Sequence, residues 1–120
     1  MFFMPPNASF QEEFQAGQSS GLNGATWYAE NAGILGTALG TGGTFDYQRN
    51  GSMLYLQYAN AANYGVGVYM AGAGYSLPQT ISIARSFASI AGSTGNEGQR
   101  LSETVAGWSA ANQGAFGVMK

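Results

Sequence analysis

The chain has 120 residues, a formal net charge of −2 at pH 7, and neither histidine nor cysteine. Without imidazole or thiolate groups it can build neither a Ser–His or Cys–His nucleophile pair nor an ordinary zinc site. Its four basic residues are too few to neutralise many phosphates, so DNA is not expected as a partner. The length and the hydrophobic content of 45% predict one folded domain over residues 1–120.

The N-terminal part of the chain carries the signals of two helices. Ser9 and Glu12 form a capping-box pair, which predicts a short helix that ends at Gly17. Apolar and aromatic residues then recur near helical spacing, which predicts a second helix over residues 26–39. The glycine-rich run at residues 40–43 ends this second helix.

The central part of the chain predicts a β-hairpin at about residues 44–58. Asn50-Gly51 lies between two segments, residues 44–49 and 52–58, that are rich in residues suited to strands. Asn-Gly is the strongest short hairpin signal, because both central residues of the favoured turn need positive φ.

Two helices are expected directly after the hairpin. The first is a Gly/Ala-rich buried helix over residues 63–73. The second begins at Ser76, which forms a capping box with Gln79 and is followed by a proline in the first turn. Gly92 closes the second of these helices.

A last helix is predicted over residues 99–112, with Leu101, Val105 and Trp108 on its inward face. Together these elements predict an α+β fold, in which short helices pack around one hairpin at about residues 44–58. The order of helix and hairpin is like that of lysozymes.

No charged residue occurs between Arg49 and Arg85. The most apolar part of this stretch, residues 66–77, is shorter than the roughly 20 apolar residues that a membrane-spanning helix needs, and it holds glycines. A buried core segment is therefore the expected interpretation, and membrane contact is not expected. A pore-forming module stays open as the alternative.

Proton transfer in this chain would rest on six carboxylates, Glu12, Glu13, Glu30, Asp46, Glu97 and Glu103. Glu12 and Glu13 diverge on a helix and make a poor metal pair, and no spacing elsewhere indicates a metal or a cofactor. Glu30 lies on a predicted helix and Asp46 on the following predicted strand, the order of the two catalytic carboxylates of lysozymes. Glycoside hydrolysis uses one protonated and one ionised carboxyl, which favours this pair as a catalytic site.

Other side chains near this pair suit a sugar-binding site. Trp27 and Tyr47 are expected to desolvate the acid and to stack on sugar rings. Arg49, just before the turn, is expected to bind an anionic group with its guanidinium. The plainer interpretation is that Glu30 is a solvated helix residue, Asp46 an ordinary ion-pair partner and Arg49 a solubilising charge.

Three short motifs follow one another in the middle of the chain: Phe45-Asp-Tyr-Gln-Arg49, Ala62-Asn-Tyr-Gly-Val-Gly67 and Gly72-Ala-Gly-Tyr-Ser76. Together they resemble the polymorphic toxin type 44 domains over about residues 44–92. The resemblance implies the C-terminal domain of a large secreted bacterial toxin, delivered into competing cells, with a cognate immunity protein as partner. The matching polar residues are Asp46, Arg49, Asn63 and Tyr64, although Gln48 and Arg49 stand where the family often has a lysine.

These observations predict an antibacterial toxin domain that hydrolyses the glycan strands of peptidoglycan, with the periplasm of the target cell favoured as the place of action. Glu30 is the expected general acid, and Asp46 the nucleophile, base or anionic stabiliser. Arg49, Asn63 and Tyr64 are expected to position the substrate. A metal-independent ribonuclease toxin using Asp46, Arg49 and Tyr64 is the first alternative. A pore-forming module and a structural or phage-particle subunit are the non-enzymatic alternatives.

Overall fold

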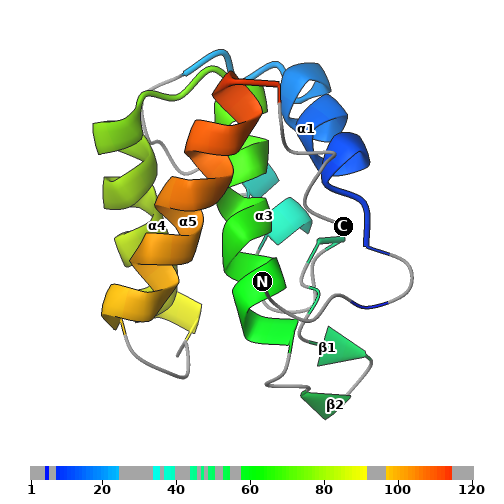
Figure 1. Ribbon diagram of the computed structural model, residues 1–120, viewed down its shortest axis with the longest axis vertical. Helices are drawn as coiled ribbons and strands as arrows, with labels where there is room; N and C mark the ends of the chain where they lie inside the picture. The colour runs from blue at the N-terminus through cyan, green and yellow to red at the C-terminus, as the bar shows by residue number, and fades with distance from the viewer. Residues whose placement is uncertain are drawn as a thin grey trace.

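The computed structural model describes residues 5, 8–24, 34–35, 37–39, 44–45, 47, 49–50, 53–54, 58–91 and 97–114. Its long elements are the helices α1 (Phe10–Ser19), α3 (Ala59–Gly72), α4 (Leu77–Ala91) and α5 (Glu97–Asn112), and residues 34–35 and 37–39 are also helical. Helix α3 runs through the middle of the molecule, with α1 on one side and with α5 and α4 on the other (Figure 1). The packing of α3 against α5 and α1 organises the fold.

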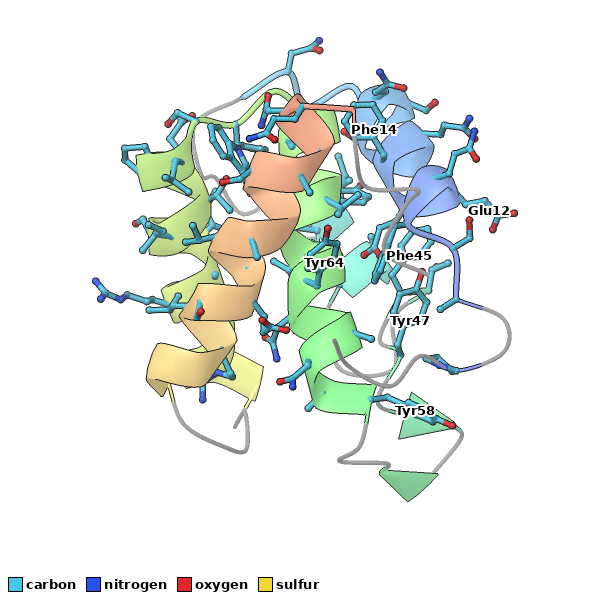
Figure 2. The ribbon with its side chains drawn as sticks, in the orientation of Figure 1. Glu12, Phe14, Phe45, Tyr47, Tyr58 and Tyr64 are labelled. Atoms are coloured by element: carbon cyan, nitrogen blue, oxygen red, sulfur yellow. The ribbon has the colours of Figure 1, made fainter. Side chains whose placement is uncertain are left out.

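Helix α1 begins where its capping signal predicts. The hydroxyl oxygen of Ser9 accepts the backbone N–H of Glu12 at 3.2 Å, which satisfies one of the free donors of the first turn. The backbone N–H of Ser9 itself is donated to the hydroxyl of Tyr47, also at 3.2 Å. The Glu12 side chain is exposed and points away from the helices (Figure 2). The helix ends at Ser19 rather than at Gly17.

Helix α3 is apolar on nearly all sides, as expected for a helix that other elements surround. One side, with Ala61, Tyr64 and Val68, joins a core cluster with Phe10 of α1 and Ala111 of α5. The other side joins a second core cluster, which contains Leu22, Leu35, Ala38, Tyr69, Met70, Ala73, Tyr75 and Ile83. The helix begins at Ala59, four residues before the predicted start, and its N-cap residue Tyr58 makes no side-chain capping bond that sequence could reveal.

Glycine allows α3 and α5 to meet backbone to backbone. A Cβ atom at Gly67 would overlap the carbonyl oxygen of Thr104, and one at Gly107 would overlap that of Tyr64. The closely packed face of α5 therefore contains Thr104, Gly107 and Ala111, which are buried. Leu101, Val105 and Trp108, which were predicted to share one face of this helix, are half-buried. Small residues, not large apolar ones, mark the contact.

Helix α4 confirms the second capping prediction. The backbone N–H of Gln79 donates to the Ser76 hydroxyl at 3.3 Å, and the backbone N–H of Ser76 donates to the Gln79 side-chain oxygen at 2.9 Å. The turn between α3 and α4 passes through Gly74, whose φ of +84° is a conformation that residues with a side chain rarely adopt.

The predicted α+β class, with a hairpin over residues 44–58, is wrong: the described chain is helical. Among the described residues, strand pairing is limited to β1 (Arg49–Asn50) and β2 (Met53–Leu54), with Arg49 opposite Leu54 and Asn50 opposite Met53. This register leaves Gly51-Ser52, not Asn50-Gly51, between the strands. The small ribbon lies near the start of α3 (Figure 1).

The flanks of the predicted hairpin are used in other ways. The backbone N–H groups of Thr44 and Phe45 donate to the carbonyl oxygens of Thr37 and Ala38, at 3.0 and 2.8 Å, so this segment turns back onto the preceding helical residues. Tyr58, predicted as strand, precedes α3 directly. A two-stranded ribbon alone is marginally stable, and here the helices supply the core. The lysozyme-like order of helix and hairpin is therefore not supported.

Candidate functional site

Part of the predicted site falls outside the described residues. This applies to Trp27, Glu30 and Asp46, whose predicted roles stay predictions. Arg49 lies in β1, but its side chain is likewise not among those described. The described part of the chain holds Tyr47, Asn63 and Tyr64.

Tyr47 ties the turn at residues 44–47 to the start of α1. Its hydroxyl accepts the backbone N–H of Ser9 and donates to the Ser9 carbonyl oxygen, both at 3.2 Å. Its ring lies 6.2 Å from that of Phe10 and 6.3 Å from that of Phe45, edge to face in both cases. The polar end of Tyr47 is therefore occupied by the N-cap of α1 rather than free for a ligand.

Asn63 and Tyr64 serve the helix packing. The Asn63 side-chain amide donates to the Ala59 carbonyl oxygen one turn earlier, at 2.8 Å. Tyr64 is 1% exposed and its ring centroid is 4.7 Å from that of Phe10. Burial raises the pKa of the Tyr64 hydroxyl above its usual 10.0. The structure thus places Tyr64 in the core between α1 and α3, where it presents almost no surface to a substrate.

The described carboxyl with the most unusual environment is Glu13, which sequence reasoning did not select. Its side chain is 0% exposed, and neither carboxyl oxygen has a hydrogen-bond partner among the described residues. A Cβ atom at Gly65 of α3 would overlap this carboxyl group, so glycine makes the space that it occupies. Burial raises the pKa of Glu13 well above 4.5, because a charged form would lose its hydration, and the nearby Tyr47 hydroxyl opposes the shift only in part.

Glu13 and Tyr47 influence each other at close range, although no described donor meets the Glu13 oxygens in good hydrogen-bond geometry. The Tyr47 hydroxyl, which also donates to the Ser9 carbonyl oxygen, lowers the pKa of Glu13 by less than burial raises it. Burial, and then the proximity of Glu13, raise the pKa of Tyr47. Glu13 is thus a buried carboxyl whose loss of hydration outweighs the stabilisation from its neighbour, which favours its protonated form above the ordinary pKa.

A sequence signal for Glu13 exists in the spacing of α1. Phe10, Glu13 and Gly17 follow the i, i+3, i+7 pattern of one helix face, and all three are buried. Carboxylates are rarely found fully buried, and the glycine that accommodates this one lies in another helix. Periodicity therefore places Glu13 on the inner face of α1, but only the packing shows what surrounds it.

An open groove of about 460 Å³ lies at Phe45 and Tyr69. Its walls come from α1, α3 and the two segments between them, and include Ala16, Ile34, Thr37, Thr44, Phe45 and Tyr69. The rings of Phe45 and Tyr69 are 6.2 Å apart. Ile34 is 41% exposed at the groove, an unusual value for a large apolar side chain. The groove is thus lined mainly by apolar surface, with two aromatic and two threonine residues among its members, and Figure 2 shows Phe45 and Tyr47 close together beside α1.

The part of the chain that the structure describes contains no group of three or more potential metal ligands. Among the same residues, no helix combines the length and the apolar character needed to span a membrane.

Comparison with known proteins found no match: no protein-family model, curated protein or solved structure matches the chain.

Proposed function

We propose that this chain is an antibacterial toxin domain that hydrolyses the glycan strands of peptidoglycan, with the groove at Phe45 and Tyr69 as its substrate-binding surface. The observation that carries the proposal is the composition of this groove. Aromatic faces suit the apolar faces of sugar rings, and threonine hydroxyls suit their hydroxyl groups. Phe45 is the residue directly before Asp46 in the sequence, which connects the groove to a candidate catalytic carboxylate.

The chemistry is the two-carboxyl hydrolysis of a glycosidic bond. Glu30 donates a proton to the glycosidic oxygen as its bond to the anomeric carbon breaks. Asp46 acts at the anomeric carbon, either as nucleophile, as the base that removes a proton from the attacking water, or as anionic stabiliser of the oxocarbenium-like transition state. Water adds its hydroxyl to that carbon, and its remaining proton passes to the carboxylate that acts as base, which is Asp46 in the direct displacement and Glu30, after loss of its own proton, in the other cases. No metal or cofactor enters this scheme.

The proposed roles of the other residues differ from those expected from the sequence. Substrate contact is assigned to four residues of the groove, Phe45, Tyr69, Thr37 and Thr44. Arg49 is kept as a positioning residue. Tyr47, Asn63 and Tyr64 are assigned to the framework, because their polar groups or rings are used by α1 and α3. The proposed setting is a larger secreted toxin with an immunity protein, acting in the periplasm of the target cell.

The proposal is tested with purified peptidoglycan and three variants. Glu30→Gln and Asp46→Asn should each reduce the release of glycan fragments by about 100-fold or more, the scale of a lost acid–base group. Glu12→Gln is the matched control, because it removes an exposed carboxyl and should leave activity unchanged. Mass spectrometry of the fragments identifies the bond cleaved. Full activity of both site variants would contradict the proposal.

The place of killing separates this function from the ribonuclease alternative. Directed expression in the periplasm should lyse cells, whereas expression in the cytoplasm should leave tRNA and rRNA intact. The ribonuclease scheme needs Tyr64 at the substrate, and the burial of that side chain does not favour it. Killing confined to the cytoplasm, with cleaved RNA, would replace the present proposal.

A further inference from the structure

We propose that the carboxyl of Glu13 is a positioning group, which packs between Gly65 of α3 and the hydroxyl end of Tyr47 and thereby holds the turn residues Phe45 and Tyr47 against α1. Its effect on catalysis rests on the function proposed above, because Phe45 of this turn lines the groove and Asp46 follows it. Its effect on the turn itself does not depend on that function.

Three elements meet at this carboxyl. Glu13 comes from the inner face of α1, Gly65 supplies the space on α3, and Tyr47 closes the site from the turn. The same turn is tied to α1 through both hydrogen bonds between Tyr47 and Ser9. A change at Glu13 therefore acts directly on the residues that hold the turn in place.

The carboxyl fits this place only without its charge. A carboxylate that is fully buried loses its hydration, and the nearby Tyr47 hydroxyl compensates for only part of this loss. Ionisation must then be relieved by outward movement of the side chain or by loosening of the turn. Since the folded state raises the pKa of Glu13, the folded protein holds this proton more tightly than the unfolded chain. The associated stability is complete below the ordinary pKa and is lost as pH rises through the raised one.

The titratable groups that neighbour Glu13 are not expected to titrate in the pH range between its ordinary and its raised pKa. Tyr47 from the turn and Tyr69 from α3 interact with Glu13, and burial raises the pKa of both hydroxyls above 10.0. Tyr64 of α3, in the same core cluster as Tyr47, is shifted in the same direction by burial. Glu12, next to Glu13 on α1, is exposed. Glu13 is thus the group expected to titrate at this contact between acidic and mildly alkaline pH.

The first test is an NMR titration of the unaltered protein. The side-chain carboxyl carbon of Glu13 should titrate well above 4.5, and the backbone amides of Phe45, Tyr47 and Gly65 should shift with the same midpoint. The amide of Ser102, exposed on α5, should not follow it. Titration of Glu13 in the ordinary range, or an unaffected turn while Glu13 titrates, would overturn the inference.

The second test compares Glu13→Gln with Glu12→Gln. Glu13→Gln keeps the shape without the charge, so it should abolish the transition of the turn, whereas Glu12→Gln should retain it. The folded-to-unfolded ratio of the unaltered protein should fall by up to about tenfold per pH unit between the ordinary and raised pKa, and that of Glu13→Gln should not. A transition that persists in Glu13→Gln would assign it to another group and overturn the inference.

The activity measurement keeps the two proposals apart. Peptidoglycan hydrolysis by the unaltered protein should decline as the turn amides shift, and Glu13→Gln should extend activity to higher pH. A structural substitution alone would change the rate at every pH but would not remove this limb of the profile. If neither protein cleaves peptidoglycan at any pH, the proposed function fails, and the titration of the turn still decides the role of Glu13.

Discussion

Glycine brings α3 close to α5 and also close to α1. The buried polar groups at these two contacts differ in whether they have hydrogen-bond partners. Between α3 and α5, the hydroxyl of Thr104 is 1% exposed and lies 3.0 Å from the carbonyl oxygens of Asn63 and Arg100. Between α1 and α3, the fully buried carboxyl of Glu13 has no hydrogen-bond partner among the described residues.

This difference is local to the Glu13 site, because α1 and α3 also meet backbone to backbone at Gly17 and Gly72, whose added Cβ atoms would overlap the carbonyl oxygens of Tyr69 and Phe14. At Gly67 and Gly107 the neighbouring atoms are backbone carbonyls, which cannot move without moving a helix. At Gly65 the neighbouring group is the end of the Glu13 side chain. A satisfied polar group favours one arrangement, whereas an unsatisfied one costs about 1–3 kcal/mol and keeps the contact sensitive to protonation.

The largest effect is expected from Gly107→Ala. The added methyl group meets the Tyr64 carbonyl, so α3 and α5 must separate, at a cost of about 3 kcal/mol in the free energy of unfolding. Ser102→Ala, at an exposed position of the same helix, should change this quantity by less than about 0.5 kcal/mol. Urea unfolding followed by circular dichroism measures both. Similar stabilities of the two variants would show that the contact is not rigid.

A smaller effect is expected from Gly65→Ala, because a side chain can move aside more easily than a backbone. The cost should be about 1–2 kcal/mol with Glu13 present, and lower in a Glu13→Ala background, where the new methyl group has room. The double-mutant cycle should give a coupling energy of about 1 kcal/mol. Strict additivity of the two substitutions would mean that they do not share this space.

The smallest effects are expected from substitutions of the two buried polar groups, Thr104 and Glu13. Thr104→Val removes a hydroxyl from its acceptors and should cost about 1 kcal/mol, independently of pH. Glu13→Met replaces an unpaired carboxyl with an apolar group of similar size and should be neutral, or stabilising by about 1 kcal/mol, at pH 7. This advantage should shrink at pH 4, where the carboxyl is neutral in both folded and unfolded states. Equal losses in both variants at pH 7 would contradict the comparison.

Local capping signals in the sequence predicted the starts of α1 and α4 correctly. Ser9 with Glu12, and Ser76 with Gln79, satisfy backbone donors through side chains only three residues away, and both starts are confirmed. The hairpin prediction was also local, but it overlooked competition. Phe45 contacts Tyr69 of α3 and Tyr47 contacts Phe10 of α1, so these rings contribute to the helical packing rather than to a cross-strand pair.

The prediction of the candidate site was limited in the same way, because it used only residues close together in the sequence. Sequence could restrict the acid–base groups to carboxylates and select Glu30 and Asp46 by their order, but it passed over Glu13 because burial depends on distant residues. Nothing near Glu13 in the sequence reveals that Gly65 makes room for it. Tyr64 was chosen from a motif and is a core residue instead.

By itself the sequence determined the available chemistry and the starts of α1 and α4, because composition and capping bonds involve only residues that are close together in the chain. The tertiary structure decided which glycines are contact points, which carboxyl loses its water and which aromatic rings line a groove. These properties arise where α1, α3 and α5 approach each other, and desolvation and close packing are set by all the neighbours of a group together. No single segment of the chain contains that information.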